Sequence, residues 1–88
     1  METKLPYDQI SDMLAAARAK VPPGTKWQHY RGNEYVVAGA VVLEATNEIS
    51  ILYNSATHPD VSFVRPVSSW LEKIEWNGQT LPRFTEIY

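Results

Sequence analysis

Apolar side chains recur at intervals of three and four residues over the first quarter of the chain. The series consists of Tyr7, Ile10, Leu14, Ala17 and Val21. This spacing is typical of an amphipathic helix, because residues three and four apart share one helix face. The segment Pro22-Pro23-Gly24 cannot continue a helix. The pattern therefore predicts a helix over residues 6–20, followed by a short linker.

From Lys26 onward the apolar positions alternate with a period of two, and Val, Ile, Tyr, Trp and Thr become frequent. We predict strands near residues 26–30, 35–43, 48–54, 61–66, 72–76 and 79–84. Residues 31–34 form a tight turn, and Asn77-Gly78 is a strong signal for a two-residue hairpin loop. Short strands with tight connections predict a small antiparallel barrel or a strongly curled sheet. The predicted organisation is a helix with its linker at 1–25 and a β domain at 26–88.

The second predicted strand has an unusual composition, since residues 35–43 contain no charged or amide side chain that would mark a solvated face. Both of its faces therefore need a cover. The barrel interior covers one face, and the amino-terminal helix is the nearest candidate for the other; a second copy in a homodimer is the alternative. Gly39 in the middle of this strand indicates a bend or a bulge.

Length and composition narrow the functional classes. A chain of 88 residues forms one domain. Eight basic and ten acidic side chains are interspersed and give a net charge of -2, which does not favour nucleic-acid binding. With no cysteine and only two histidines, neither a disulfide nor a metal site is predicted, and no cofactor motif is found. No membrane segment or secretory signal is recognised, so we expect a cytoplasmic protein.

Several motifs together resemble one small bacterial family. They are the opening from Trp27 to Val37, the apolar pair before Tyr53, the box from Phe63 to Pro66, Trp70, Gly78 and the ending Arg83-Phe84. The family is catalogued as domain of unknown function 1653, and the resemblance covers about residues 26–84. It implies an SH3-like small β-barrel, whose activity is unassigned. Two features depart from the family pattern: a common histidine-containing stretch is replaced here by Leu43-Glu44-Ala45-Thr46, and the amino-terminal helix is additional.

Candidate ligand-binding residues are the aromatic, imidazole and guanidinium groups near turns and strand ends. We select His29, Tyr30, Arg31, Asn33, Tyr53, Arg65, Trp70 and Arg83. Exposed aromatic and arginine side chains are typical of binding hot spots. Each has a structural alternative: Asn33 as a turn residue, Trp70 as core, and Arg65 as the ion-pair partner of Glu34 or Glu72. No catalytic residue is assigned, because no nucleophile elbow or phosphate loop is found.

The leading hypothesis is a non-enzymatic binding module for a protein, a peptide or a small anionic ligand. An RNA or single-strand-binding barrel is the alternative, since aromatic faces and arginines stack bases. A third hypothesis is an enzyme subunit that uses His29 as a base and Arg65 to hold an anion.

Overall fold

The computed structural model describes residues 5–88, so residues 1–4 of the predicted amino-terminal segment lie outside the description. Helix α1 spans Tyr7–Lys20 and begins after Pro6, within one residue of the predicted start. Asp8 lies in its first turn, and Arg18 and Lys20 lie in its last turn, where each sign of charge suits the helix dipole. The predicted amphipathic helix is confirmed.

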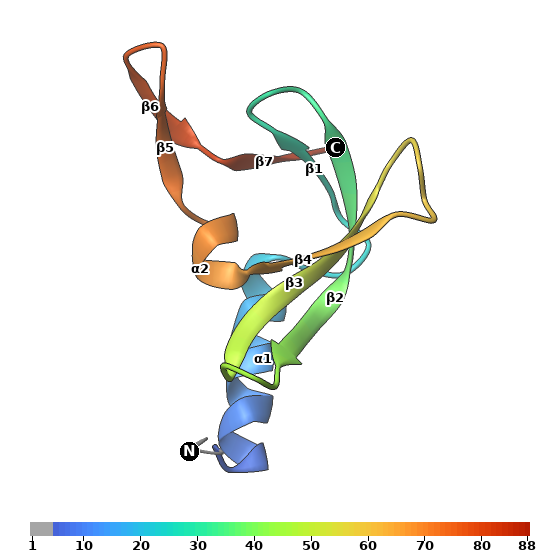
Figure 1. The fold of residues 1–88 in the computed structure, drawn as a ribbon, viewed down its shortest axis with the longest axis vertical. Helices are drawn as coiled ribbons and strands as arrows, with labels where there is room; N and C mark the ends of the chain where they lie inside the picture. Colours follow the sequence, from blue (N-terminus) through green and yellow to red (C-terminus); the bar gives the residue numbers. More distant parts are fainter. Residues whose placement is uncertain (1–4) are drawn as a thin grey trace.

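The rest of the described chain is mainly β, as predicted (Figure 1). Five strands form an antiparallel sheet in the order β4-β3-β2-β1-β7. Their bounds are β1 Lys26–His29, β2 Glu34–Leu43, β3 Glu48–Ser55, β4 Ser62–Pro66 and β7 Phe84–Ile87. Two further strands, β5 Lys73–Trp76 and β6 Gln79–Pro82, form a separate hairpin. A short helical turn, α2, covers Val67–Trp70.

The sheet is curled but not closed, which differs from the predicted barrel. Strand β7 pairs with β1, strand β4 pairs with β3, and these two edge strands do not pair with each other (Figure 1). The predicted last strand at 79–84 is divided in two, because the chain leaves the hairpin at Pro82 and pairs with β1 from Phe84 onward. Large rings from Trp27, Tyr53 and Trp70 fill the interior of the curled sheet.

One face of the sheet carries the core. Its buried apolar members are Ala17, Val21, Trp27, Val37, Ala40, Ile49, Ile51, Tyr53, Trp70 and Phe84. Residues two apart on a strand share a face, so Ile49, Ile51 and Tyr53 all point inward from β3. We call this side the inner face.

The prediction that α1 covers the second face of β2 is wrong. Ala17 and Val21 join the same core as Val37 and Ala40, so the helix packs on the inner face beside the aromatic rings. The outer face of β2 stays partly open, with Val36 37% exposed. The register of β2 against β3 shifts between Val37 and Gly39, which confirms the predicted bulge. Because of this shift, Val37 and Ala40 both belong to the core although they are three residues apart.

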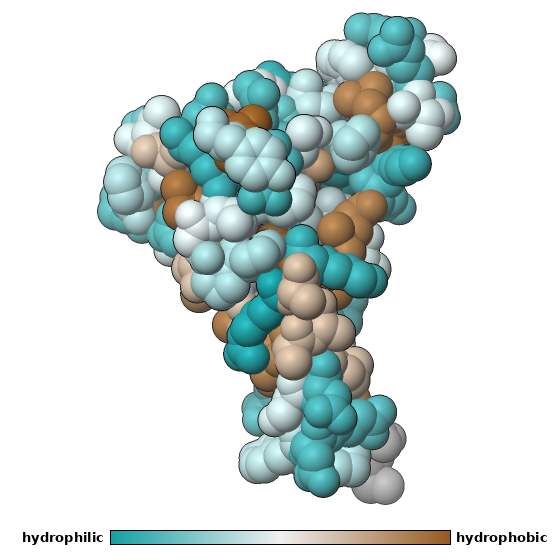
Figure 2. All heavy atoms as spheres, turned by 180° about the vertical axis from the view of Figure 1, so that it is seen from behind, coloured by the Kyte–Doolittle hydropathy of each residue, from teal (hydrophilic) through white to brown (hydrophobic). Residues whose placement is uncertain are grey.

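The side of the molecule that carries α1 shows hydrophobic and hydrophilic side chains interspersed (Figure 2).

Asn77 and Gly78 both have positive φ, at 51° and 77°, as a two-residue hairpin loop that follows the strand twist requires. The hairpin prediction at these residues is confirmed. None of the helices within residues 5–88 is long and apolar enough to cross a membrane.

We expect Ile51→Ala to lower the free energy of unfolding by about 2–5 kcal/mol, because it removes most of a fully buried side chain and leaves a cavity in its place. Urea denaturation followed by tryptophan fluorescence measures this loss. Val64→Ala is the matched control on the neighbouring strand, since Val64 is 50% exposed, and we expect its effect to stay below about 1 kcal/mol. Equal losses in the two variants would contradict the assignment of the inner face.

Candidate functional site

Arg65 extends from β4 onto the inner face, where no carboxylate of residues 5–88 pairs with it. Its Nε donates to the Tyr53 hydroxyl at 3.5 Å, and its Nη1 donates to the Ser69 hydroxyl at 2.9 Å. The guanidinium carbon lies 5.5 Å from the centre of the Phe84 ring. The described part of the chain offers Arg65 no ion pair: Glu34 pairs with Lys26 at 3.3 Å, and Glu72 pairs elsewhere. Neither carboxylate that the sequence suggested for Arg65 is therefore used by it.

Arg83 lies beside Arg65, and both arginines hydrogen-bond to Ser69. Its Nε donates to the Ser69 carbonyl oxygen at 3.1 Å, while Ser69 Oγ accepts from Arg65. Arg83 Nη2 forms an ion pair with Glu72 at 2.6 Å, and the Glu72 side chain is 57% exposed. Two guanidinium groups thus meet at one serine, and within residues 5–88 they form one ion pair, with Glu72, so the local charge is positive.

His29 lies close enough to these arginines for their charge to affect its pKa. Its ring packs edge-on against Phe84, with centroids 5.2 Å apart. Burial lowers the pKa of His29 below 6.5, and the nearby charges of Arg65, Arg83 and Arg31 lower it further. The ring Nδ1 accepts the backbone N–H of Arg31 at 3.2 Å. The proton of the neutral ring is therefore on Nε2, which presents a donor to its surroundings.

Tyr30 and Arg31 flank this cluster at the β1–β2 turn. The Arg31 guanidinium carbon lies 5.6 Å from the Tyr30 ring centre and 5.3 Å from that of Trp76. The Tyr30 and Trp76 rings meet edge-on at 5.1 Å. Trp76 is 39% exposed, so this group of three side chains offers a stacking surface at the tip of the β5–β6 hairpin.

The predicted site residues thus divide into four groups. Arg65 and Arg83 meet at Ser69, and His29 lies near both. The Tyr53 hydroxyl accepts from Arg65. Tyr30 and Arg31 lie alongside with Trp76. Trp70 is 1% exposed and belongs to the core, so it cannot touch a ligand directly. Asn33 lines a cavity between the β1–β2 turn and the β3–β4 loop.

Sequence reasoning missed Ser69, the residue that joins the two arginines. It lies in α2, which was not predicted, since four residues are too few to show a helical period. The available signal was Pro66, because a proline often precedes or begins a helix.

No group of three or more His, Asp or Glu side chains suited to a metal ion occurs in the part of the chain that the structure describes.

The fold and the site define a small, mainly β domain with an arginine cluster supported by an aromatic core. A family model described as a protein of unknown function, DUF1653, matches residues 25–86, and the chain belongs to this family. A crystal structure of a family member from Bordetella bronchiseptica is similar, with a TM-score of 0.62 and 26% sequence identity. The similarity covers 74% of this chain and 85% of that chain. No curated protein matches significantly.

The lowered pKa of His29 has a consequence for stability. The unfolded chain binds a proton at about pH 6.5 and the folded chain only at lower pH, so folding is disfavoured as pH falls below 6.5. We expect the wild type to lose stability relative to His29→Gln when urea denaturation is compared at pH 7.5 and pH 5. Well above pH 6.5 the ring is neutral in both the folded and the unfolded chain, so His29 should no longer lower the free energy of unfolding there. A stability difference that does not change with pH would contradict the assigned environment of His29.

Proposed function

We propose that the chain is a non-enzymatic binding module whose arginine cluster, made of Arg65, Arg83 and the neighbouring His29, holds a small anionic ligand. One observation carries this proposal: Arg65 is partly buried on the inner face without a carboxylate partner among residues 5–88. Partly buried charges are normally paired, since desolvation without compensation is costly. An anion would supply the missing charge.

The hydrogen-bonding capacity of Arg65 supports the same conclusion. A guanidinium group has five N–H donors, and two of the Arg65 nitrogens bond to Tyr53 and Ser69. Within residues 5–88, Nη2 of Arg65 has no hydrogen-bond partner and is not buried, so its donors are accessible to solvent. Planar donors of this kind bind carboxylate, sulfate and phosphate oxygens in pairs.

The state of His29 favours binding over base catalysis. Its Nδ1 is engaged by the Arg31 backbone N–H, so the neutral ring offers an N–H donor at Nε2 rather than a free lone pair. An N–H donor strengthens anion binding. A general base needs an available lone pair close to its substrate.

Sulfate is a suitable probe, because its charge does not change near neutral pH. We expect Arg65→Gln to weaken sulfate binding by about tenfold to a hundredfold, the loss of one charge-assisted interaction of about 1.5–3 kcal/mol. Isothermal titration or amide chemical-shift titration measures the affinity. Arg18→Gln is the matched control, since it removes the same charge from the last turn of α1. Equal affinities in the two variants would refute the assigned role of Arg65.

Single-stranded nucleic acid is a second candidate, which the exposed Trp76 with Arg31 over its ring favours. We expect weak binding of a mixed-sequence oligonucleotide at low salt, lost in Trp76→Ala and decreasing as salt is added. Fluorescence anisotropy at two or more salt concentrations measures it. No detectable oligonucleotide binding at the lowest salt concentration would eliminate this candidate.

A further inference from the structure

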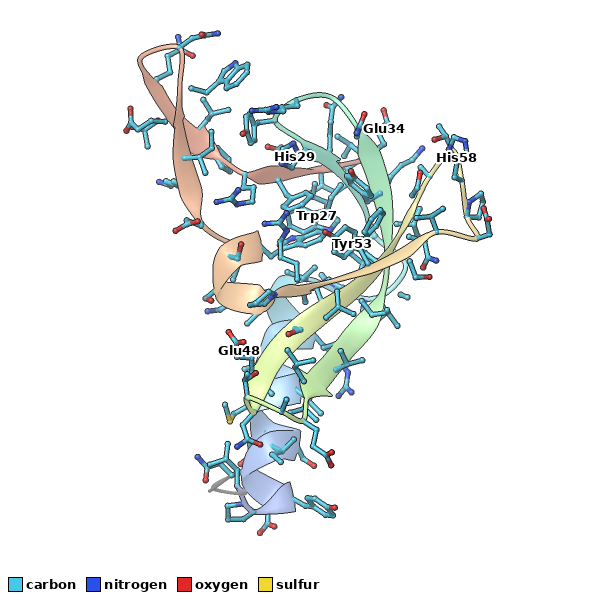
Figure 3. All side chains as sticks on the ribbon, in the orientation of Figure 1. Trp27, His29, Glu34, Glu48, Tyr53 and His58 are labelled. Atoms are coloured by element: carbon cyan, nitrogen blue, oxygen red, sulfur yellow. The ribbon has the colours of Figure 1, made fainter. Side chains whose placement is uncertain are left out.

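A cavity lies on the inner side of β4, where Phe63 lines it two residues before Arg65. It has a volume of about 650 Å³ and lies between the β1–β2 turn and the β3–β4 loop. Glu34 and His58 lie on the two sides of this space (Figure 3). Its volume is within the usual range for small-molecule pockets, about 300–1,000 Å³.

The wall and the rim of this cavity differ in chemistry. Tyr35 and Phe63 form an aromatic wall, with ring centroids 6.0 Å apart and planes at 89°. Phe63 is 42% exposed although it points to the inner face. An exposed ring beside a cavity presents apolar surface that a flat, apolar ligand would cover.

The rim carries two hydroxyl groups and an imidazole ring that are joined by hydrogen bonds. Ser55 Oγ lies 3.3 Å from Thr57 Oγ1, and Thr57 Oγ1 lies 3.0 Å from His58 Nδ1. The His58 backbone N–H also donates to Ser55 Oγ at 3.1 Å. These bonds order the loop before a ligand arrives, which lowers the entropy cost of binding.

The aromatic wall continues directly into the arginine cluster. Phe63 and Arg65 are two residues apart on β4 and share its inner face, which separates them by about 7 Å along the strand. Tyr53 connects them, since its ring centroid is 5.6 Å from that of Phe63 and its hydroxyl accepts from Arg65. A single small molecule is long enough to reach both.

Charge sets the direction of such a ligand. The cationic groups are at the Arg65 end, whereas the side chains that line the cavity include no lysine or arginine and do include the Glu34 carboxylate. A second anionic group at the cavity end would find no lysine or arginine among the lining residues, and the nearby Lys26 is already paired with Glu34. The cavity end therefore suits a neutral ring with a hydrogen-bonding substituent.

We infer that the cavity and the arginine cluster form one elongated site for an aromatic anion, whose charged group binds Arg65 and whose ring lies against Phe63. This inference rests on the proposed anion-binding function. It adds the class of ligand: an aryl sulfate, phosphate or carboxylate in place of a simple inorganic anion.

Methyl sulfate and phenyl sulfate test the inference, because they have the same charge and differ only in the ring. We expect phenyl sulfate to bind about tenfold more tightly, as burial of one aromatic face predicts. Phe63→Ala should reduce phenyl sulfate binding to the level of methyl sulfate and leave methyl sulfate unchanged. Val64→Ala, on the opposite face of the same strand, is the matched control. Amide chemical-shift titration measures each affinity and reports whether the Asn33 and Thr57 signals move.

The outcomes separate this inference from the proposed function. Equal affinities for the two sulfates, lost together in Arg65→Gln, would overturn the elongated site and leave the anion site standing. A preference for phenyl sulfate that persists in Phe63→Ala would also overturn it. Failure of both sulfates to bind the wild type would overturn the proposed function and this inference together. A preference that depends on Phe63 and moves the Asn33 and Thr57 signals supports the inference.

Discussion

The stack of Trp70 on Phe84 is the contact on which the rest of the structure depends. The rings are 3.9 Å apart at an angle of 6°, and they join α2 to β7. Burying an aromatic ring of this size removes about 150–250 Å² from water, worth about 4–6 kcal/mol. Trp70 Nε1 is buried without an acceptor among residues 5–88, at a cost of about 1–3 kcal/mol. Packing therefore exceeds the hydrogen-bond cost and fixes α2 against the sheet.

This stack also places the arginines. Because Trp70 is fixed, Ser69 directly before it is held where its hydroxyl and carbonyl oxygens accept from Arg65 and Arg83. Phe84 serves both roles, since it stacks on Trp70 and lies 5.5 Å from the Arg65 guanidinium carbon. Ring faces thus support a cation that elsewhere would rest on a carboxylate. The positive charge of Arg65 is consequently not neutralised by a carboxylate among residues 5–88, which is the basis of the proposed anion site.

Local patterns in the sequence predicted the local elements, and they failed where distant segments decide the outcome. The spacing in α1, the bulge beside Gly39 and the Asn77-Gly78 loop each depend on a few neighbouring residues, and each is present. Closure of the sheet and the face chosen by α1 depend on how large rings fill the interior, which periodicity does not report. For the same reason the sequence identified Arg65 and Arg83 as candidates but not their meeting at Ser69.

The distribution of charge favours a small ligand over a long one. The whole chain has a net charge of -2, whereas Arg65, Arg83 and Arg31 lie close enough together to lower the pKa of His29. Charges are screened beyond about 8–10 Å at physiological salt, so a small anion in contact with the cluster responds mainly to the arginines and to Glu72, which is paired with Arg83. A polyanion extends past the cluster onto the acidic remainder of the surface and gains less. A ligand with one charged group and a neutral ring uses the attraction without meeting the repulsion.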